Sequence, residues 1–140
     1  MDQILIVKAL QQHLPKGVEF AYLFGSYASG RSTKNSDIDI AVFPTEPMTS
    51  IAVWESAQAI SKQLNKDVDL INLMECNTVL RFQVVTEGLF LVGDRIKADF
   101  FETDTFRMYQ DLQYSRQDNL ASFVERWKNE NAGGNEVVRK

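Results

Sequence analysis

The hydrophobic pattern near the N-terminus changes from helical to strand spacing within a short distance. Apolar residues recur every three or four positions through residues 2–14 and predict a helix, which Pro15 and Gly17 end. Val18–Phe24 is rich in β-branched and aromatic residues and predicts a short buried strand. Residues 37–43 alternate strictly, with isoleucine and valine on one face and aspartate and alanine on the other, so they predict a second strand.

A longer helix with an apolar stripe is predicted over residues 50–65. Ser50 or Thr49 can cap its N-terminus, because a side-chain hydroxyl accepts a hydrogen bond from the first turn. We expect the stripe to pack on the sheet. Its members are Ile51, Trp54, Ala57, Ile60 or Ser61, and Leu64.

The remaining pattern continues to alternate strands with helices. Residues 66–73 predict a third strand, residues 77–87 a helix that Gly88 ends, and residues 89–92 a short strand. Residues 98–128 contain neither glycine nor proline and predict one long helix or two shorter ones.

This last helical region carries more aromatic side chains than one helix needs to dock on a small sheet. These side chains either cap the domain's own core or face another chain, and the pattern leaves both possibilities open. Residues 129–140 have no periodic apolar pattern and are expected to be a flexible tail. We therefore expect a single domain over residues 1–128, which includes the C-terminal helical segment.

Composition and charge narrow the classes of function. The chain is 44% hydrophobic and 24% charged, as globular proteins are, and its net charge of -4 gives no broad basic surface. Direct binding of nucleic acid is therefore not expected. The sequence has no signal-peptide pattern and no apolar run of about 18 residues, so we expect a cytoplasmic protein without a membrane partner. With one cysteine, Cys76, and one histidine, His13, a zinc site is not expected either.

Two aspartates share one face of the second predicted strand. Strand alternation places Asp37 and Asp39 on the same side, and two ionised carboxylates at about 5 Å repel by roughly 3 kcal/mol at an effective dielectric of about 20. A divalent cation offsets this repulsion, and oxygen-only ligands are those that Mg²⁺ or Mn²⁺ prefers. Asp69, on the third strand, is the natural third ligand, whereas Asp67 fits a solvated position at the strand's start. The alternative is that all these aspartates are turn and edge residues of a solvated sheet face.

Gly25-Ser26 follows the first strand and suits a phosphate. Glycine lets a phosphate approach the backbone closely, and the N–H groups of a following helical turn, with the Ser26 hydroxyl, can donate hydrogen bonds to it. Alone this dipeptide carries no information. Together with two strand aspartates ten residues later and a third on another strand, it becomes specific.

Gly25-Ser26, ten further residues and then Asp37-Ile38-Asp39 form a pattern that resembles the GSx₁₀DxD signature of the nucleotidyltransferase superfamily related to DNA polymerase β. The short single-domain form is similar to the minimal nucleotidyltransferases (MNT), antitoxins that are paired with HEPN-domain RNase toxins. The resemblance implies an α/β (α+β) fold, in which a small mixed β-sheet is flanked by helices and followed by a C-terminal helical region. It also implies transfer of AMP from ATP to a hydroxyl, with two Mg²⁺ ions. The implied acceptor is a tyrosine of a cognate toxin held in a hetero-oligomer.

The same resemblance assigns roles residue by residue. Gly25 and Ser26 would hold the triphosphate, and Asp37 and Asp39 the metal ions. Asp69 would bind the catalytic metal and help to deprotonate the acceptor hydroxyl. The loop between the two halves of the motif supplies further candidates for binding the nucleotide, namely Arg31, Lys34 and Ser36. The two cations among them are as easily explained as solvated loop residues.

Two other functions remain open from the sequence. Small-molecule nucleotidylation, as in aminoglycoside-modifying relatives, uses the same motif, but those relatives add a helical domain or a dimer partner that builds the acceptor pocket. An antitoxin that neutralises its toxin by binding alone would use the aromatic C-terminal helix as the interface and would not need the aspartates.

Overall fold

A computed structural model describes residues 3–14, 16–30 and 36–131. The chain divides into two compact units, Met1–Phe106 and Arg107–Lys140, and the last helix contributes residues to both. In chain order the helices and strands are α1 (Gln3–His13), β1 (Val18–Phe24), α2 (Ser26–Ser29), β2 (Ile38–Pro44), α3 (Ser50–Leu64), β3 (Val68–Asn72), α4 (Thr78–Glu87), β4 (Leu89–Gly93) and α5 (Arg95–Asn131).

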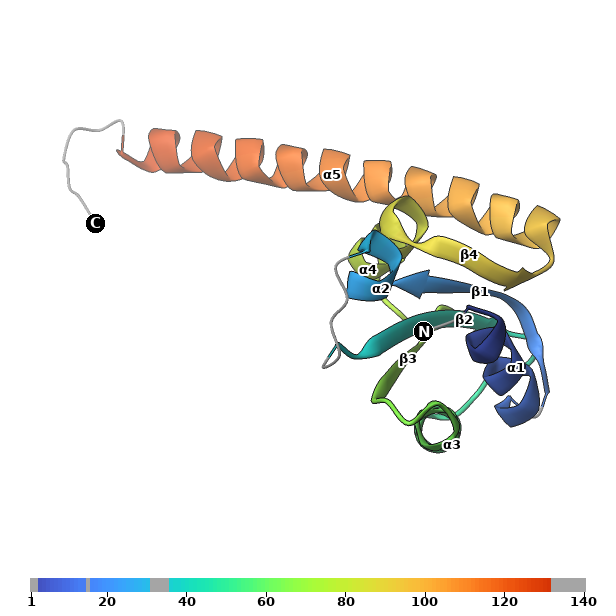
Figure 1. The fold of residues 1–140 in the computed structure, drawn as a ribbon. Helices are drawn as coiled ribbons and strands as arrows, with labels where there is room; N and C mark the ends of the chain where they lie inside the picture. Colours follow the sequence, from blue (N-terminus) through green and yellow to red (C-terminus); the bar gives the residue numbers. More distant parts are fainter. Residues whose placement is uncertain (1–2, 15, 31–35, 132–140) are drawn as a thin grey trace. The chain divides into compact units, whose positions relative to one another are not determined.

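The strands form one mixed sheet in the order β3-β2-β1-β4 (Figure 1). β1 lies antiparallel to both β2 and β4, whereas β2 and β3 are parallel and are connected through α3. The α/β fold class expected from the sequence, a small mixed sheet flanked by helices, is confirmed. The strand and helix assignments are also confirmed, with bounds that differ by a few residues.

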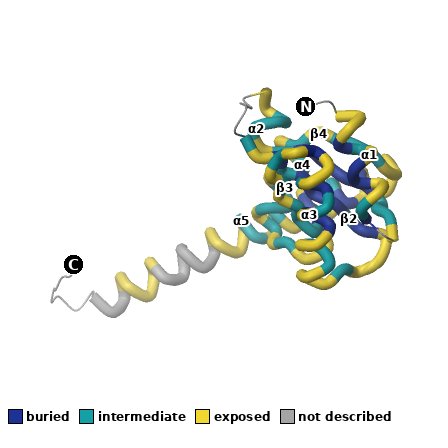
Figure 2. Tube along the Cα trace, turned by 60° about the horizontal axis from the view of Figure 1, so that its bottom comes forward, coloured by how far each residue is buried: buried dark blue, intermediate teal, exposed yellow. Residues whose placement is uncertain are grey.

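Each face of the sheet has its own hydrophobic core. Side chains of α1 and α3 pack on one face against alternate residues of β1 and β2, among them Ile38 and Ile40, which are fully buried. The other face carries Phe20, Tyr22 and Ala41, which are covered by α4 and by the first turns of α5. The buried positions accordingly concentrate in the strands and on the helix faces that touch them (Figure 2). Asp39 has the same strand parity as Ala41 and therefore belongs to this second face.

The predicted stripe of α3 is wrong at its N-terminal end. Thr49 caps the helix, since its hydroxyl accepts a hydrogen bond from the N–H of Ala52 at 3.1 Å, but Ile51 is 71% exposed and Trp54 63% exposed. At about 100° per residue, Ile51 stands opposite Ile60 on the helix. The face that packs on the sheet instead consists of Ser56, Ala57, Ile60 and Leu64.

The last helix is continuous and starts earlier than its apolar pattern indicates. Asp94 precedes α5, and its carboxylate accepts hydrogen bonds from the N–H groups of Ile96 at 3.0 Å and Lys97 at 3.2 Å. Phe101 is buried against the sheet, whereas Phe100 is 71% and Tyr114 76% exposed, so only part of the aromatic surface covers the core.

The predicted boundary between a domain ending at residue 128 and a tail over 129–140 stays a prediction. The helix continues to Asn131, and residues 132–140 lie outside the described residues. Within the described chain, no helix is long and apolar enough to span a membrane.

Candidate active site

Strand register brings the two halves of the motif together. In the antiparallel pair of β1 and β2, Phe24 stands opposite Asp39, and in the parallel pair of β2 and β3, Asp39 stands opposite Asp69. Neighbouring strands lie about 4.8 Å apart. The Gly25-Ser26 turn, which follows Phe24, therefore emerges beside Asp39, and Asp69 lies on the other side of Asp39.

Gly25 is fitted to the Asp39 carboxylate. Its backbone angles, φ 74° and ψ -151°, fall in a region that is essentially open to glycine alone. A Cβ atom at this position would lie 3.1 Å from Cγ of Asp39 and closer still to Oδ2. The missing side chain thus lets the turn run directly past the carboxylate.

The turn after Gly25 is a single helical turn, α2. The carbonyl of Gly25 accepts hydrogen bonds from the N–H groups of Ala28 at 3.2 Å and Ser29 at 3.1 Å, and Gly30 ends the turn in the left-handed conformation. The first N–H groups of a helical turn have no partner within that turn. Those of Ser26 and Tyr27 are therefore the donors that this geometry can offer to an anion next to Asp39.

The carboxylates interact with one another directly. Partial burial, then the charges of Asp69 and Asp37, and finally a hydrogen bond between the carboxyl groups of Asp39 and Asp69 raise the pKa of Asp39 above its ordinary value. Asp37 and Asp69 are exposed and Asp39 is half-buried. Burial and the neighbouring carboxylates therefore disfavour the charged form of Asp39, and a bound cation would relieve this effect.

The donor set fits Mg²⁺ in its chemistry, because it consists of carboxylate oxygens only. Nevertheless, among the residues that the structure describes, no three acidic, histidine or cysteine side chains are already arranged to hold a metal ion. Binding of a cation would therefore require these carboxylates to turn toward a common centre.

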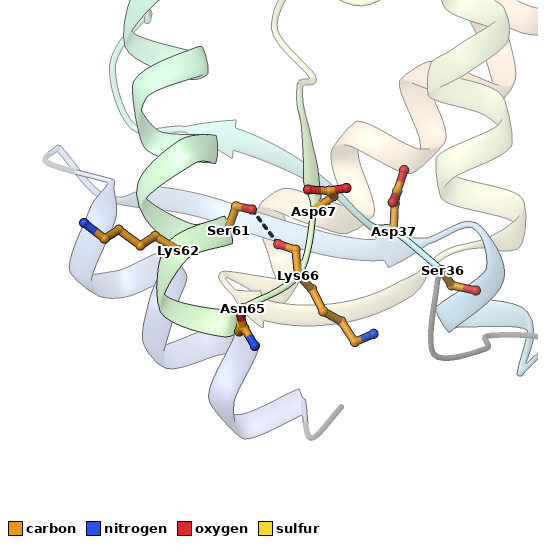
Figure 3. A pocket seen from close by; sticks show the side chains of 7 residues that line it. All are labelled: Ser36, Asp37, Ser61, Lys62, Asn65, Lys66 and Asp67. Carbon is orange, nitrogen blue, oxygen red and sulfur yellow. Dashed lines mark hydrogen bonds between the residues drawn. The ribbon is translucent and has the colours of Figure 1, made fainter.

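Of the other predicted site residues, the structure describes Ser36 alone. Ser36 lies directly before Asp37, at the rim of a cavity of about 620 Å³ (Figure 3). Arg31 and Lys34 lie outside the described residues.

We call this cavity the α3 pocket; apart from Ser36 and Asp37, its lining residues were not predicted from the sequence as site residues. Its wall comes from the end of α3 and the start of β3 and includes Lys62, Lys66 and Asp67 (Figure 3). Lys66 and Asp67 directly precede the strand that carries Asp69, so their position in the sequence could have indicated that they lie near the site. Lys62 lies on α3, and its position near the site becomes evident only once the end of α3 is placed relative to the sheet.

A mixed sheet that carries a Gly-Ser turn against paired strand carboxylates defines a nucleotidyltransferase. Residues 5–96 match the family described as "Polymerase beta, Nucleotidyltransferase", and the chain belongs to this family.

The chain is also similar to individual proteins of known function or structure. The chain is 46% identical over 117 residues to protein adenylyltransferase MntA of Shewanella oneidensis, which covers 84% of each protein. A solved toxin–antitoxin structure with AMP-PNP contains a chain that is 41% identical, with a TM-score of 0.79 and coverage of 89% of this chain and 99% of that one. A second, of a tri-AMPylated S. oneidensis HEPN toxin in complex with MNT antitoxin, matches at 39% identity with a TM-score of 0.71, over 87% of this chain and 95% of that one. The resemblance recognised in the motif is confirmed.

Proposed function

We propose that this protein is an antitoxin adenylyltransferase, which transfers AMP from ATP to a tyrosine hydroxyl of a cognate HEPN RNase toxin. Pyrophosphate leaves, and the modified toxin is neutralised. The two proteins would act as a hetero-oligomer in the cytoplasm. Support comes from the family, from the similarity to protein adenylyltransferase MntA and from the toxin–antitoxin complexes among the similar structures.

One observation carries the assignment of the site: Gly25, Asp39 and Asp69 meet across three adjacent strands. The turn can receive a phosphate on one side of Asp39, and Asp69 can receive an acceptor hydroxyl on the other. An in-line displacement at phosphorus has the leaving oxygen and the attacking oxygen on opposite sides, and this order of groups across the strands would suit it.

The chain's own residues then have distinct roles. The backbone N–H groups and hydroxyl at Ser26 bind the triphosphate, and Gly25 keeps that contact close. Asp37, Asp39 and Asp69 would hold two Mg²⁺ ions, which supply positive charge for the developing charge on the phosphate oxygens. Asp69 orients the acceptor hydroxyl and helps to remove its proton. Arg31, Lys34 and Ser36 remain proposed contacts of the nucleotide.

The test is an assay of AMP transfer with matched variants. The protein and its candidate HEPN toxin are incubated with ATP and Mg²⁺, and the toxin is weighed by intact mass spectrometry. We expect Asp37→Asn with Asp39→Asn to lower transfer at least about 100-fold, because metal ions contribute several kcal/mol to such reactions. The control, Glu46→Gln with Glu55→Gln, makes the same change of charge at two exposed acids outside the site and should transfer normally.

Each outcome separates the candidate functions. Absence of added AMP on the toxin with the wild-type protein would reject the proposed reaction. Full neutralisation of the toxin by the aspartate variant, without added mass, would instead support an antitoxin that acts by binding alone.

A further inference from the structure

A second cavity, of about 390 Å³, lies between the sheet and the first turns of α5, and we call it the α5 pocket. Three phenylalanine rings that line it, those of Phe20, Phe43 and Phe101, pack on one another with centroids 5.1–5.6 Å apart. Phe43 stands four residues after Asp39 on β2, a distance of about 13 Å along the strand. The α5 pocket therefore lies at the other end of the strands from the candidate active site.

The walls of the α5 pocket are held in place by contacts between α5 and its neighbours. The Arg81 guanidinium, from α4, lies 4.1 Å from the centre of the Phe101 ring, and its Nε–H donates to the Thr105 hydroxyl at 3.1 Å. The Lys97 ammonium, on α5, donates to the Glu19 carboxylate, next to the start of β1, at 2.7 Å. The cavity is thus formed before anything binds, so that binding does not have to order its walls.

Exposed apolar side chains of α5 stand beside this cavity. Phe100 lines the pocket and is nevertheless 71% exposed. Ile96, one helical turn earlier and on the same side of the helix, is 68% exposed. Large apolar side chains that gather on a surface mark places where another molecule binds. This surface thus combines a projecting aromatic side chain with an aromatic-lined cavity.

The order of charges along α5 makes the same surface complementary to a copy of itself. Lys97 and Asp104 both line the pocket and are exposed. They are seven residues apart, close to two helical turns, so they lie on one side of α5 with Phe100 and Phe101 between them. Where two such helices cross in antiparallel fashion at Phe100 and Phe101, Lys97 of each copy stands opposite Asp104 of the other. Two pairs of opposite charge then flank the apolar contact, as the polar rim of an interface does.

We propose that the α5 pocket is a contact between two copies of this chain, in which Phe100 of each copy enters the pocket of the other. A two-fold interface uses one patch on both copies, and this patch carries both the projecting side chain and the cavity that receives it. The Lys97 ammonium has three donors, so it can bind Asp104 of the second copy while it keeps Glu19 of its own chain. Because the contact lies at the other end of the strands, it does not depend on the proposed reaction.

The size of the contact sets its expected strength. Phe100 and Ile96 would each bury roughly 100–150 Å², and the walls that receive them lose a comparable area. A two-fold pair therefore buries about 1,000 Å² in all, at the low end for specific interfaces. We expect a weak dimer, with a Kd of about 10–100 µM.

The experiment measures the Kd of the dimer by sedimentation equilibrium of the full chain alone, over about 5–500 µM. Phe100→Ser should raise the Kd at least about tenfold, because it removes the side chain that fills the pocket. Ile51→Ser is the matched control: Ile51 is also 71% exposed but lies on α3, so its loss should leave the Kd unchanged.

A pair of charge reversals tests the arrangement of the two copies. Lys97→Glu and Asp104→Lys should each weaken the dimer about tenfold, because each places like charges opposite one another. An equimolar mixture of these two variants should dimerise again, since opposite charges then face each other at both positions. A purely structural role of Lys97 or Asp104 within one chain would not produce this recovery.

Three results would overturn the proposal. These are a wild-type protein that stays monomeric over the whole range, a Phe100→Ser variant with the wild-type Kd, and a mixture of the two charge variants that stays monomeric. A monomeric wild type whose Lys97 is shielded from acetylation only after the toxin is added would assign the α5 pocket to the toxin instead. Since no measurement in this series involves AMP transfer, each of these results leaves the proposed function standing.

Discussion

Replacing Gly25 with alanine tests whether the close passage of the turn past Asp39 shapes the site. The added Cβ would lie 3.1 Å from Cγ of Asp39 and 3.4 Å from its Cβ, with the nearest carboxylate oxygen closer than either. The backbone at φ 74° and ψ -151° is unfavourable for alanine even without this contact. The carboxylate, the turn or both must therefore move.

The expected cost follows from these two effects. Strain in this backbone region costs about 1–3 kcal/mol, and displacing the Asp39 side chain from its rotamer adds about 0.5–1.5 kcal/mol. Loss of glycine's freedom in the unfolded chain offsets about 0.4–1 kcal/mol. We expect a net loss of about 0.5–4 kcal/mol in the free energy of unfolding, which lowers the melting temperature by roughly 2–16 °C. A shift of about 1 Å in a catalytic group can cost about 100-fold in rate, so AMP transfer should fall by about that factor.

The assay combines thermal unfolding with the rate of AMP transfer. Gly30→Ala is the matched control, because Gly30 also has a positive φ, 77°, but an added Cβ would meet nothing within 4 Å. It should lose about 1 kcal/mol of stability and keep its activity. If Gly25→Ala transferred AMP at the wild-type rate, the reasoning that ties this glycine to the carboxylate would be refuted, whatever happened to its melting temperature.

Three further predictions concern single side chains. The pKa of Asp39 is raised in the fold, so the metal-free protein should lose stability as the pH rises from below about 4 through that pKa. Asp39→Asn should remove this loss and should abolish AMP transfer. In the presence of a chelator at pH 7, it should raise the free energy of unfolding by up to about 1 kcal/mol after solvent screening. A variant that melts at a lower temperature than the wild type at pH 7 would contradict this. Tyr22 is buried and donates a hydrogen bond to Glu102 at 2.5 Å, so Tyr22→Phe should cost about 1–2 kcal/mol in urea unfolding and leave transfer intact. Thr49→Ala, which removes the cap of α3, should cost about 1 kcal/mol, and an unchanged urea midpoint would show that the cap is dispensable.

Local sequence signals were sufficient for most of the fold, because the strands and helices of this chain are short, strongly patterned and bounded by glycine, proline or capping residues. They were insufficient where two faces of a helix competed. Ile51 and Trp54 are apolar, but the helix geometry turns them away from the face that contains Ala57 and Ile60. The early start of α5 could have been predicted, since Asp94 directly after Gly93 is an N-cap signal.

The site, like the fold, has features that local sequence patterns predict and features that they do not. Strand alternation is local, so the shared face of Asp37 and Asp39 followed from the sequence. The contact of Gly25 with Asp39 depends on the register between β1 and β2, and the α3 pocket depends on where α3 ends above the sheet. Both depend on how segments distant in the sequence pair and pack, and local patterns in one sequence do not predict this.

The position of β3 at the edge of the described sheet has a consequence for how the chain avoids aggregation. An edge strand offers unpaired backbone groups to other chains, and natural proteins protect such edges with charged side chains. Asp67 and Asp69 supply charges at this edge, whereas Val68, Leu70 and Ile71 are only half-buried. The same carboxylate that would serve the reaction thus also discourages strands of two molecules from pairing. Replacing Asp69 with alanine would leave a continuous apolar run on an open edge, and the loss of solubility that follows would reduce activity independently of any chemistry.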